Sequence, residues 1–141
     1  MPNETLPTNA ICPISYALEI FGDRWTLLVL RDLMLNGRRR YRELLACPEG
    51  IATNVLADRL RRLEQRGLIT KVKDPEDARQ FLYAPTETAI ALVPMLLEMI
   101  VWSIDNGDVA VDPRLVQRFR EDRERWIGET QDVIRRSIAA S

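Results

Sequence analysis

Apolar residues recur at helical spacing along most of the chain. They predict a short helix at about 13–21, a second from residue 24 to Asn36-Gly37, and one or two turns at 42–46. In the second helix, a capping Asp23 precedes apolar positions that repeat about every 3.6 residues: Trp25, Leu28, Val29 and Leu33. This part of the pattern is typical of a mainly α domain.

Residues 51–67 form the most informative helical segment. Leu56, Leu60 and Leu63 fall on one narrow face of a helix, and Gly67 suits a left-handed stop. The opposite face and its edges are polar or small: Thr53, Asn54, Ala57, Asp58, Arg61, Arg62 and Gln65. Small and polar groups are what a helix needs in order to reach base edges in the major groove of DNA.

The pattern changes after Gly67, where two short runs, 68–73 and 80–84, carry β-forming residues around an Asp-Pro turn. We therefore predict a hairpin with a protruding loop at 74–79. A helix, a short helix, a helix with a polar outer face and then a hairpin is the order of a winged helix-turn-helix. The predicted fold class is mainly α with a small β-hairpin wing, followed by a C-terminal helical extension.

Residues 87–105 predict one long helix that is apolar around nearly its whole circumference. A helix of this kind must be covered on two sides, and a domain this small covers only one. A partner chain would cover the other side, so we expect a homodimer formed by five residues of this helix: Leu92, Leu96, Met99, Ile100 and Trp102.

A narrow apolar stripe continues from residue 113 to 138 among many charged residues. Its members lie near heptad spacing: Leu115, Phe119, Trp126 and Val133, with Ile127, Ile134 and Ile138 beside them. We expect this extension to pack along the dimer helix around Trp102, in its own or the other subunit. The predicted organisation is a DNA-binding and dimerisation domain at 10–105 and a helical extension at 106–141.

Charge supports DNA binding once its distribution is considered. The chain has 20 basic and 21 acidic residues, yet residues 38–73 hold ten basic and four acidic ones, a net charge of +6. A phosphate backbone responds to this local potential. Besides the helix face at 53–62, the expected DNA contacts are therefore basic residues before it and in the hairpin loop: Arg38, Arg39, Arg40 and Arg79.

An ordered series of short motifs resembles the HxlR-type winged-helix regulators, bacterial transcription factors related to the MarR group. The matching residues are Cys12-Pro13, the run from Gly22 to Leu28, Arg40-Tyr41, Glu43-Leu44, Gly50-Ile51-Ala52, Leu56, Leu60, Leu63-Glu64, Gly67-Leu68-Ile69, Tyr83, Thr86, Leu92, Pro94 and Trp102. The departures are few: Ala89 replaces a usual glycine, Arg24 a common lysine, and Thr70-Lys71 the usual basic residue after Gly-Leu-Ile.

This resemblance implies a homodimer that binds double-stranded DNA at an operator with two half-sites and regulates nearby genes, most simply as a repressor. It also implies that a cysteine at position 12 can serve as a redox or electrophile sensor. Cys12 would stand at a helix N-terminus, where the dipole favours a thiolate, and Cys47 would lie in the turn before the recognition helix. Each cysteine has the alternative of being a small buried apolar residue.

Composition argues against an enzyme. The chain has no histidine, which rules out Ser-His-Asp, Cys-His and His-metal chemistry within it, and two cysteines cannot form a four-cysteine zinc site. No glycine-rich phosphate loop is present. We expect no cofactor, no metal and no catalytic residue.

The remaining expectations concern location and the alternative function. The polar start of the chain does not resemble a signal peptide, and the 16-residue apolar run from Ala89 to Ile104 is shorter than the ~20 residues that span a bilayer. We expect a cytoplasmic protein without a membrane partner. The alternative function is a winged-helix adaptor that binds proteins and leaves its basic face unused.

Overall fold

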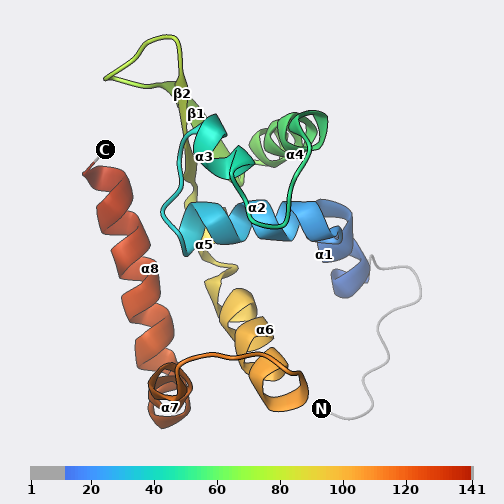
Figure 1. Cartoon of the computed structure of the whole chain (residues 1–141), viewed down its shortest axis with the longest axis vertical. Helices are drawn as coiled ribbons and strands as arrows, with labels where there is room; N and C mark the ends of the chain where they lie inside the picture. The colour runs from blue at the N-terminus through green and yellow to red at the C-terminus, as the bar shows by residue number, and fades with distance from the viewer. Residues whose placement is uncertain (1–11, 141) are drawn as a thin grey trace.

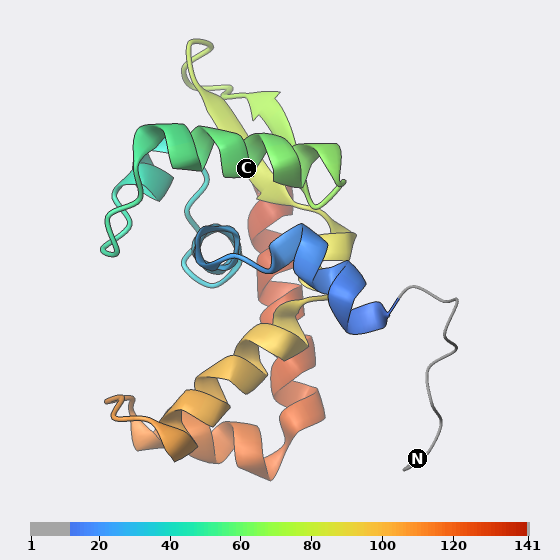
Figure 2. The same ribbon diagram turned by 90° about the vertical axis from the view of Figure 1, so that its right-hand side faces the viewer.

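The computed structural model describes residues 12–140 as a helical molecule with one hairpin. Its elements are α1 (Pro13–Phe21), α2 (Arg24–Met34), α3 (Tyr41–Leu45), α4 (Thr53–Gln65), β1 (Ile69–Lys73), β2 (Phe81–Pro85), α5 (Glu87–Ile90), α6 (Val93–Asn106), α7 (Pro113–Glu121) and α8 (Arg123–Ala139). In Figures 1 and 2, α3, α4 and the hairpin form the upper part, and α6 and α7 form the lower part. α8 runs along one side from α7 to the base of the hairpin (Figure 1). Residues 10 and 11 of the predicted domain lie outside the described residues.

The winged helix-turn-helix order predicted from the sequence is confirmed. Asp23 caps α2 by accepting a hydrogen bond from the Thr26 amide, and Gly67 ends α4 with a φ of 75°. The apolar stripe of α4 lies in the core, where it packs on α2; its members are Leu56, Leu60 and Leu63. The polar face of α4 is thereby turned to solvent.

The hairpin pairs in an antiparallel register from Ile69 with Pro85 to Lys73 with Phe81. The linker before α3 adds to it, because the Tyr83 amide donates to the Arg39 carbonyl at 2.8 Å and Arg40 forms a bridge with Leu82. Strand β2 of the wing is therefore held by the chain that leads into α3.

The single helix predicted for residues 87–105 is wrong in one respect, because the chain divides into α5 and α6 at Ala91 and Leu92. Pro94 is the physical reason. It lacks the amide hydrogen that would bond to the Ile90 carbonyl one turn earlier. The Gln131 side chain of α8 donates to that carbonyl instead, at 3.1 Å.

The C-terminal extension folds back on its own chain as α7 and α8, and α8 packs on α6. Phe119 and Ile134 are buried in the same core as α2 and α4, and Phe119 meets Trp126 edge to face at 5.0 Å. One expectation needs correction. Val133 is 56% exposed, because the buried position on this turn of α8 is Ile134, about 100° further around the helix. Trp102 is not covered by the extension of its own chain, so contact with the extension of the other subunit stays a prediction.

The stretch Glu87–Asn106 is, by length and composition alone, long and apolar enough to cross a membrane. The apolar run from Ala89 to Ile104 has 16 residues, and the stretch that contains it has 20. Here it is part of the folded domain, with Val93, Leu96 and Leu97 buried.

Candidate nucleic-acid interface

The outer face of α4 is exposed and polar along its length. Thr53, Asn54 and Ala57 at its N-terminal half are open to solvent. About one turn beyond Ala57, the side chains of Arg61 and Arg62 are 63% and 61% exposed. The structure thus places these five predicted site residues together on one helix face.

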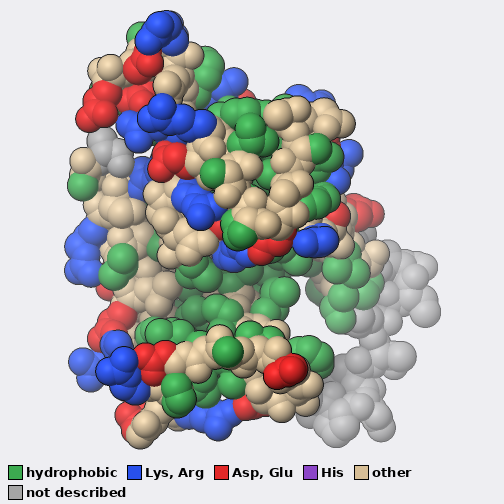
Figure 3. Space-filling view, viewed as in Figure 1, with side chains coloured by type: hydrophobic (Ala, Val, Ile, Leu, Met, Phe, Trp, Pro, Cys, Tyr) green, Lys and Arg blue, Asp and Glu red, His purple; other side chains and the backbone are tan. Residues whose placement is uncertain are grey.

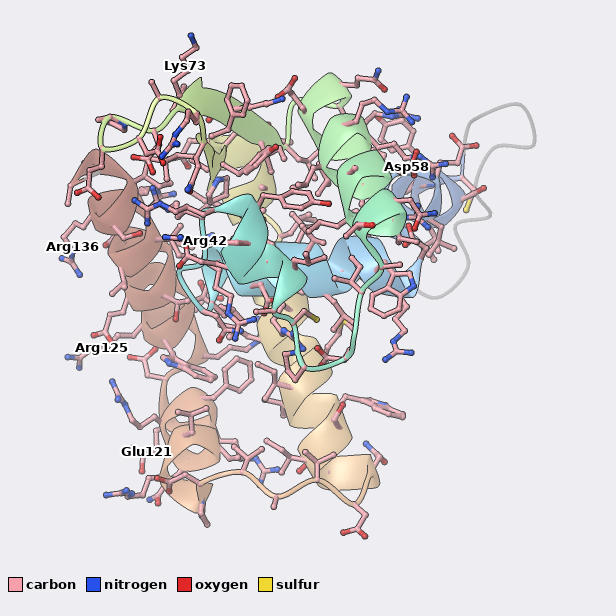
Figure 4. The ribbon with its side chains drawn as sticks, turned by 45° about the horizontal axis from the view of Figure 1, so that its top comes forward. Arg42, Asp58, Lys73, Glu121, Arg125 and Arg136 are labelled. Carbon is pink, nitrogen blue, oxygen red and sulfur yellow. The ribbon has the colours of Figure 1, made fainter. Side chains whose placement is uncertain are left out.

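Asp58 is the acidic residue in the middle of this face, and it lies among arginines (Figure 4). Its carboxylate accepts hydrogen bonds from Arg59 and Arg61, both at 2.6 Å, and pairs with Arg62 at 3.0 Å. Partial burial alone would raise the pKa of Asp58, but the hydrogen bonds from Arg61 and Arg59 hold that pKa below its usual value. Asp58 therefore stays ionised and neutralises part of the positive charge of α4.

Two contacts orient α4 on the helices beneath it. The Tyr41 hydroxyl of α3 donates to the Thr53 carbonyl at 2.9 Å, at the N-terminus of α4. Arg59 donates to the Asp23 carboxylate at 2.9 Å, which links α4 to the cap of α2. Fixed side chains of this kind set the angle at which α4 is presented.

A polar cluster secures the turn that precedes α4. Arg31 of α2 donates two hydrogen bonds to Glu49, at 2.7 and 2.9 Å, and the buried Cys47 thiol donates to the same carboxylate at 2.8 Å. The hydrogen bonds from Arg31 and Cys47 lower the pKa of Glu49. Burial, together with the bond to Glu49, raises the pKa of the Cys47 thiol, so this thiol stays protonated at neutral pH.

The three arginines predicted before α3 all have partners inside the fold. Arg38 pairs with the buried Asp32 at 3.4 Å, and Arg39 donates to the Ser137 hydroxyl of α8 at 2.9 Å. Arg40 donates to the buried Asp74 at the start of the hairpin loop at 2.8 Å, and this contact lowers the pKa of Asp74. Arg38 and Arg40 thus hold the linker and the wing in place, and their predicted DNA contacts stay predictions.

The hairpin loop carries Arg79 at its tip, with a side chain that is 90% exposed and paired with Asp77 at 3.1 Å. Lys71, Lys73 and Arg42 belong to the basic block at 38–73 but are not among the DNA contacts predicted from the sequence. All three are exposed, and Figure 4 shows Lys73 on the hairpin and Arg42 on α3. Lys71 and Lys73 are two residues apart, which places both on one face of a strand. This spacing is the sequence signal for a basic face on the wing.

The predicted dimer residues differ in exposure. Trp102 is 66% exposed and Met99 is exposed, whereas Leu96 is buried inside its own chain and Leu92 and Ile100 are half-buried. α1 has no buried residue, and it leaves three large apolar side chains open to solvent: Ile14, Tyr16 and Leu18. Cys12 stands half-buried at the N-cap of α1.

Within residues 12–140, no group of three or more cysteine, aspartate or glutamate side chains is arranged to hold a metal ion. What the site offers is a helix with an exposed polar and basic face, carried by a helix-turn-helix and flanked by a wing. This arrangement defines a winged helix-turn-helix protein.

Residues 20–110 match the profile of the HxlR-like helix-turn-helix family. The chain belongs to that family, and it is a transcriptional regulator of the helix-turn-helix type and not an enzyme.

Relatives support the assignment. An uncharacterised helix-turn-helix regulator, sll1512 of Synechocystis, is 36% identical over 65% of this chain and 67% of its own length. The regulator YodB of Bacillus subtilis is 32% identical over 67% of this chain and 85% of its own length. Among solved structures, PA1607, a transcription factor by its description, shares 31% identity with a TM-score of 0.65 over 74% of this chain and 71% of its own. The oxidised redox regulator HypR shares 28% identity with a TM-score of 0.59, over 70% of this chain and all of its own.

Proposed function

We propose that this regulator acts as a homodimeric repressor on an operator with two half-sites, with α4 in the major groove of each. The observation that carries the proposal is the outer face of α4, where Thr53, Asn54 and Ala57 precede Arg61 and Arg62 on one exposed surface. Two recognition helices related by a two-fold axis would lie about 34–36 Å apart, one turn of DNA. The protein would act in the cytoplasm, where its DNA is.

Base contacts belong to the exposed face of α4 between Thr53 and Arg61 in this proposal, and phosphate contacts to its flanks. Asn54 suits adenine, and Arg61 suits guanine or a phosphate. Arg79, Lys71, Lys73 and Arg42 extend the basic surface along the wing and α3, where they would meet the backbone beside the half-site. Arg38 and Arg40 act mainly by holding this surface in shape.

The experiment is fluorescence anisotropy with labelled DNA from upstream of the protein's own gene, measured over a range of salt concentrations. We expect specific binding at least ~10³ tighter than binding to unrelated DNA. Arg61→Ala should cost about 1–3 kcal/mol and relax selectivity at one base pair if Arg61 reads a base. A uniform loss on all sequences would make Arg61 a phosphate contact. Binding no tighter than to unrelated DNA would refute the proposal and favour the adaptor.

The exposed apolar side chains of α1 and the C-terminal end of α6 support the homodimer. Ile14, Tyr16 and Leu18 on α1 and Trp102 on α6 are large, apolar and open to solvent in the single chain. Exposed apolar patches mark protein contact sites. In the proposed dimer, the second copy would cover these side chains.

A redox response through Cys12 is a further part of the proposal. HypR is described as a redox regulator, and YodB has been solved in reduced, diamide-treated and quinone-bound forms. Cys12 stands at a helix N-terminus and is half-buried, whereas Cys47 is buried and hydrogen-bonded to Glu49. Diamide should therefore change DNA binding of the native chain and of Cys47→Ser, and leave Cys12→Ser unaffected. A response that survives Cys12→Ser would exclude Cys12 as the sensor.

A further inference from the structure

An apolar groove lies between α2, α6 and the C-terminal extension. It has a volume of about 470 Å³, and its walls come from all three parts of the chain: Leu27, Leu28, Leu96, Ile100, Leu115 and Trp126. Figure 3 shows apolar side chains gathered in the hollow between the upper part of the molecule and α6 and α7. This volume falls within the range of about 300–1,000 Å³ that is typical of small-molecule sites.

Polar contacts at both ends attach the extension to α5 and α6. Towards the wing, Arg135 of α8 donates two hydrogen bonds to Glu87 of α5, at 2.8 and 3.0 Å. At the other end, Arg123 pairs with Glu98 and Arg120 with Asp105, which fastens α7 and the start of α8 to α6. Trp126 and Thr130, the two residues of α8 that line the groove, lie between these two attachments in the sequence.

The few polar groups in the groove wall already have partners. Arg31 donates to Glu49, Asn36 donates to Asp32 at 2.7 Å, and the Thr130 hydroxyl donates to the Trp126 carbonyl at 2.8 Å. A charged ligand entering the groove would lose its hydration without gaining a free partner. An uncharged, mainly apolar ligand would lose nothing of this kind and would bury its surface against leucine, isoleucine and tryptophan side chains.

The groove is on a different face of α6 from the exposed Trp102. At about 100° per residue, Trp102 lies roughly 120–160° around the helix from Leu96 and Ile100, and Met99 stands at the boundary between the two faces. The face of α6 that carries Trp102 therefore shares only Met99 with the lining of the groove. Part of its wall also comes from residues beyond the family match, since Leu115, Trp126 and Thr130 follow residue 110.

We propose that this groove is the binding site for an uncharged, largely apolar small molecule. The proposal goes beyond the DNA-binding function and does not depend on it. The site exists because the extension supplies a third wall to what would be an open face of α2 and α6.

The test uses the full chain and N-phenyl-1-naphthylamine, an uncharged apolar probe whose fluorescence rises when it leaves water. We expect a saturable increase with one site per chain. Leu28→Trp fills the groove, and Leu115→Arg places a charge at its exposed rim; each should weaken probe binding at least tenfold. Val109→Arg changes an exposed apolar residue in the loop outside the groove and should keep the probe affinity within twofold.

Circular dichroism and the thermal midpoint identify any variant that fails to fold, and Leu115 is exposed enough to accept arginine. Energy transfer from tryptophan to the probe gives a second readout, and Trp126→Phe should reduce it because Trp126 lines the groove. Equal affinity in all variants, or an increase that does not saturate, would overturn the proposal. Probe release that follows dimer formation as the chain is concentrated would also overturn it and assign the groove to a second copy.

Discussion

Asp23 connects two parts of the DNA-binding unit through one side chain. Its carboxylate caps α2 through the Thr26 amide at 3.0 Å and accepts a hydrogen bond from Arg59 of α4 at 2.9 Å. Partial burial opposes ionisation, but the hydrogen bonds from Thr26 and Arg59 lower the pKa of Asp23 to about 2. The pair therefore stabilises the seating of α4 on α2 at neutral pH.

The first prediction is that Asp23→Asn, which keeps a capping side chain but removes the charge, costs about 1 kcal/mol or less at pH 7. The cost is small because Asp23 is 38% exposed and solvent screens the pair. A carboxyl with a lowered folded-state pKa stabilises the fold above its unfolded pKa of 3.8 and loses that contribution as pH falls through about 2. Urea unfolding at pH 7 and pH 2.5 measures the difference between the two proteins. A difference that grows towards acid pH would contradict the ion pair.

Asp58 should weaken DNA binding, because its negative charge lies on the face of α4 that is proposed to approach phosphates. The second prediction is that Asp58→Asn tightens binding to unrelated DNA and steepens its salt dependence by about one charge, since one carboxylate no longer competes for Arg61 and Arg62. Anisotropy at several salt concentrations measures both effects. Glu64→Gln, an exposed acid-to-amide change near the end of α4, is the matched control. An unchanged salt slope for Asp58→Asn would place this face away from the DNA.

At this scale the sequence predicted which residues are buried better than which residues pair. The stripe of Leu56, Leu60 and Leu63 followed from helical spacing alone. The partners of Arg38 and Arg40 did not, because Asp32 and Asp74 come close to them only when the linker, α2 and the wing fold together. An arginine that is exposed in a helical or extended pattern and one that is tied to a buried carboxylate look the same in the sequence.

Among the elements, the junction of α5 and α6 shows how a local break is compensated by a distant helix. Pro94 leaves the Ile90 carbonyl without its helical donor, and Gln131 of α8 supplies one. Pro94 was visible in the sequence, but the sequence did not show that a helix some 40 residues later would occupy the gap.

The third prediction is that Gln131→Leu destabilises the fold by about 1–3 kcal/mol, because it leaves a half-buried carbonyl without a donor. The same substitution should cost less in a Pro94→Ala background, where the restored amide at position 94 can bond to Ile90. Urea unfolding of the native chain, the two single variants and the double variant gives the coupling free energy between positions 94 and 131. Asp132→Ala, which removes an exposed ion pair with Arg135, should change stability by less than about 1 kcal/mol. Equal effects of Gln131→Leu in both backgrounds would show that the two residues act independently.

In the whole molecule, α8 joins regions that are far apart in the sequence. Trp126 near its start lines the apolar groove, and Ser137 near its end accepts a hydrogen bond from Arg39. The Arg39 carbonyl in turn accepts from Tyr83 of the wing. One rigid helix therefore contacts both the groove and the linker that supports the wing. The amphipathic pattern predicted a helix packed on the dimer helix, in its own or the other subunit, and the structure places it on α6 of the same chain.

Because α8 covers one face of α6 within the chain, the surface left for a second copy is narrower than the sequence suggested. Leu96 is already buried, and Trp102 is the largest apolar side chain left open on α6. Large aromatic residues at the centre of an interface commonly contribute 2 kcal/mol or more to association. The contribution of α6 to a dimer would therefore be concentrated at Trp102.

The fourth prediction is that Trp102→Glu weakens the dimer at least about thirtyfold, the equivalent of 2 kcal/mol, while the folded chain keeps its thermal midpoint because Trp102 is 66% exposed. Sedimentation velocity at low micromolar concentration should show monomer for this variant and dimer for the native chain. Val109→Glu places the same charge in an exposed position of the loop after α6 and should leave the dimer intact. Operator binding should weaken in Trp102→Glu in proportion to the loss of dimer, because each half-site alone offers only one recognition helix. A dimer that survives Trp102→Glu would move the interface away from the C-terminal end of α6.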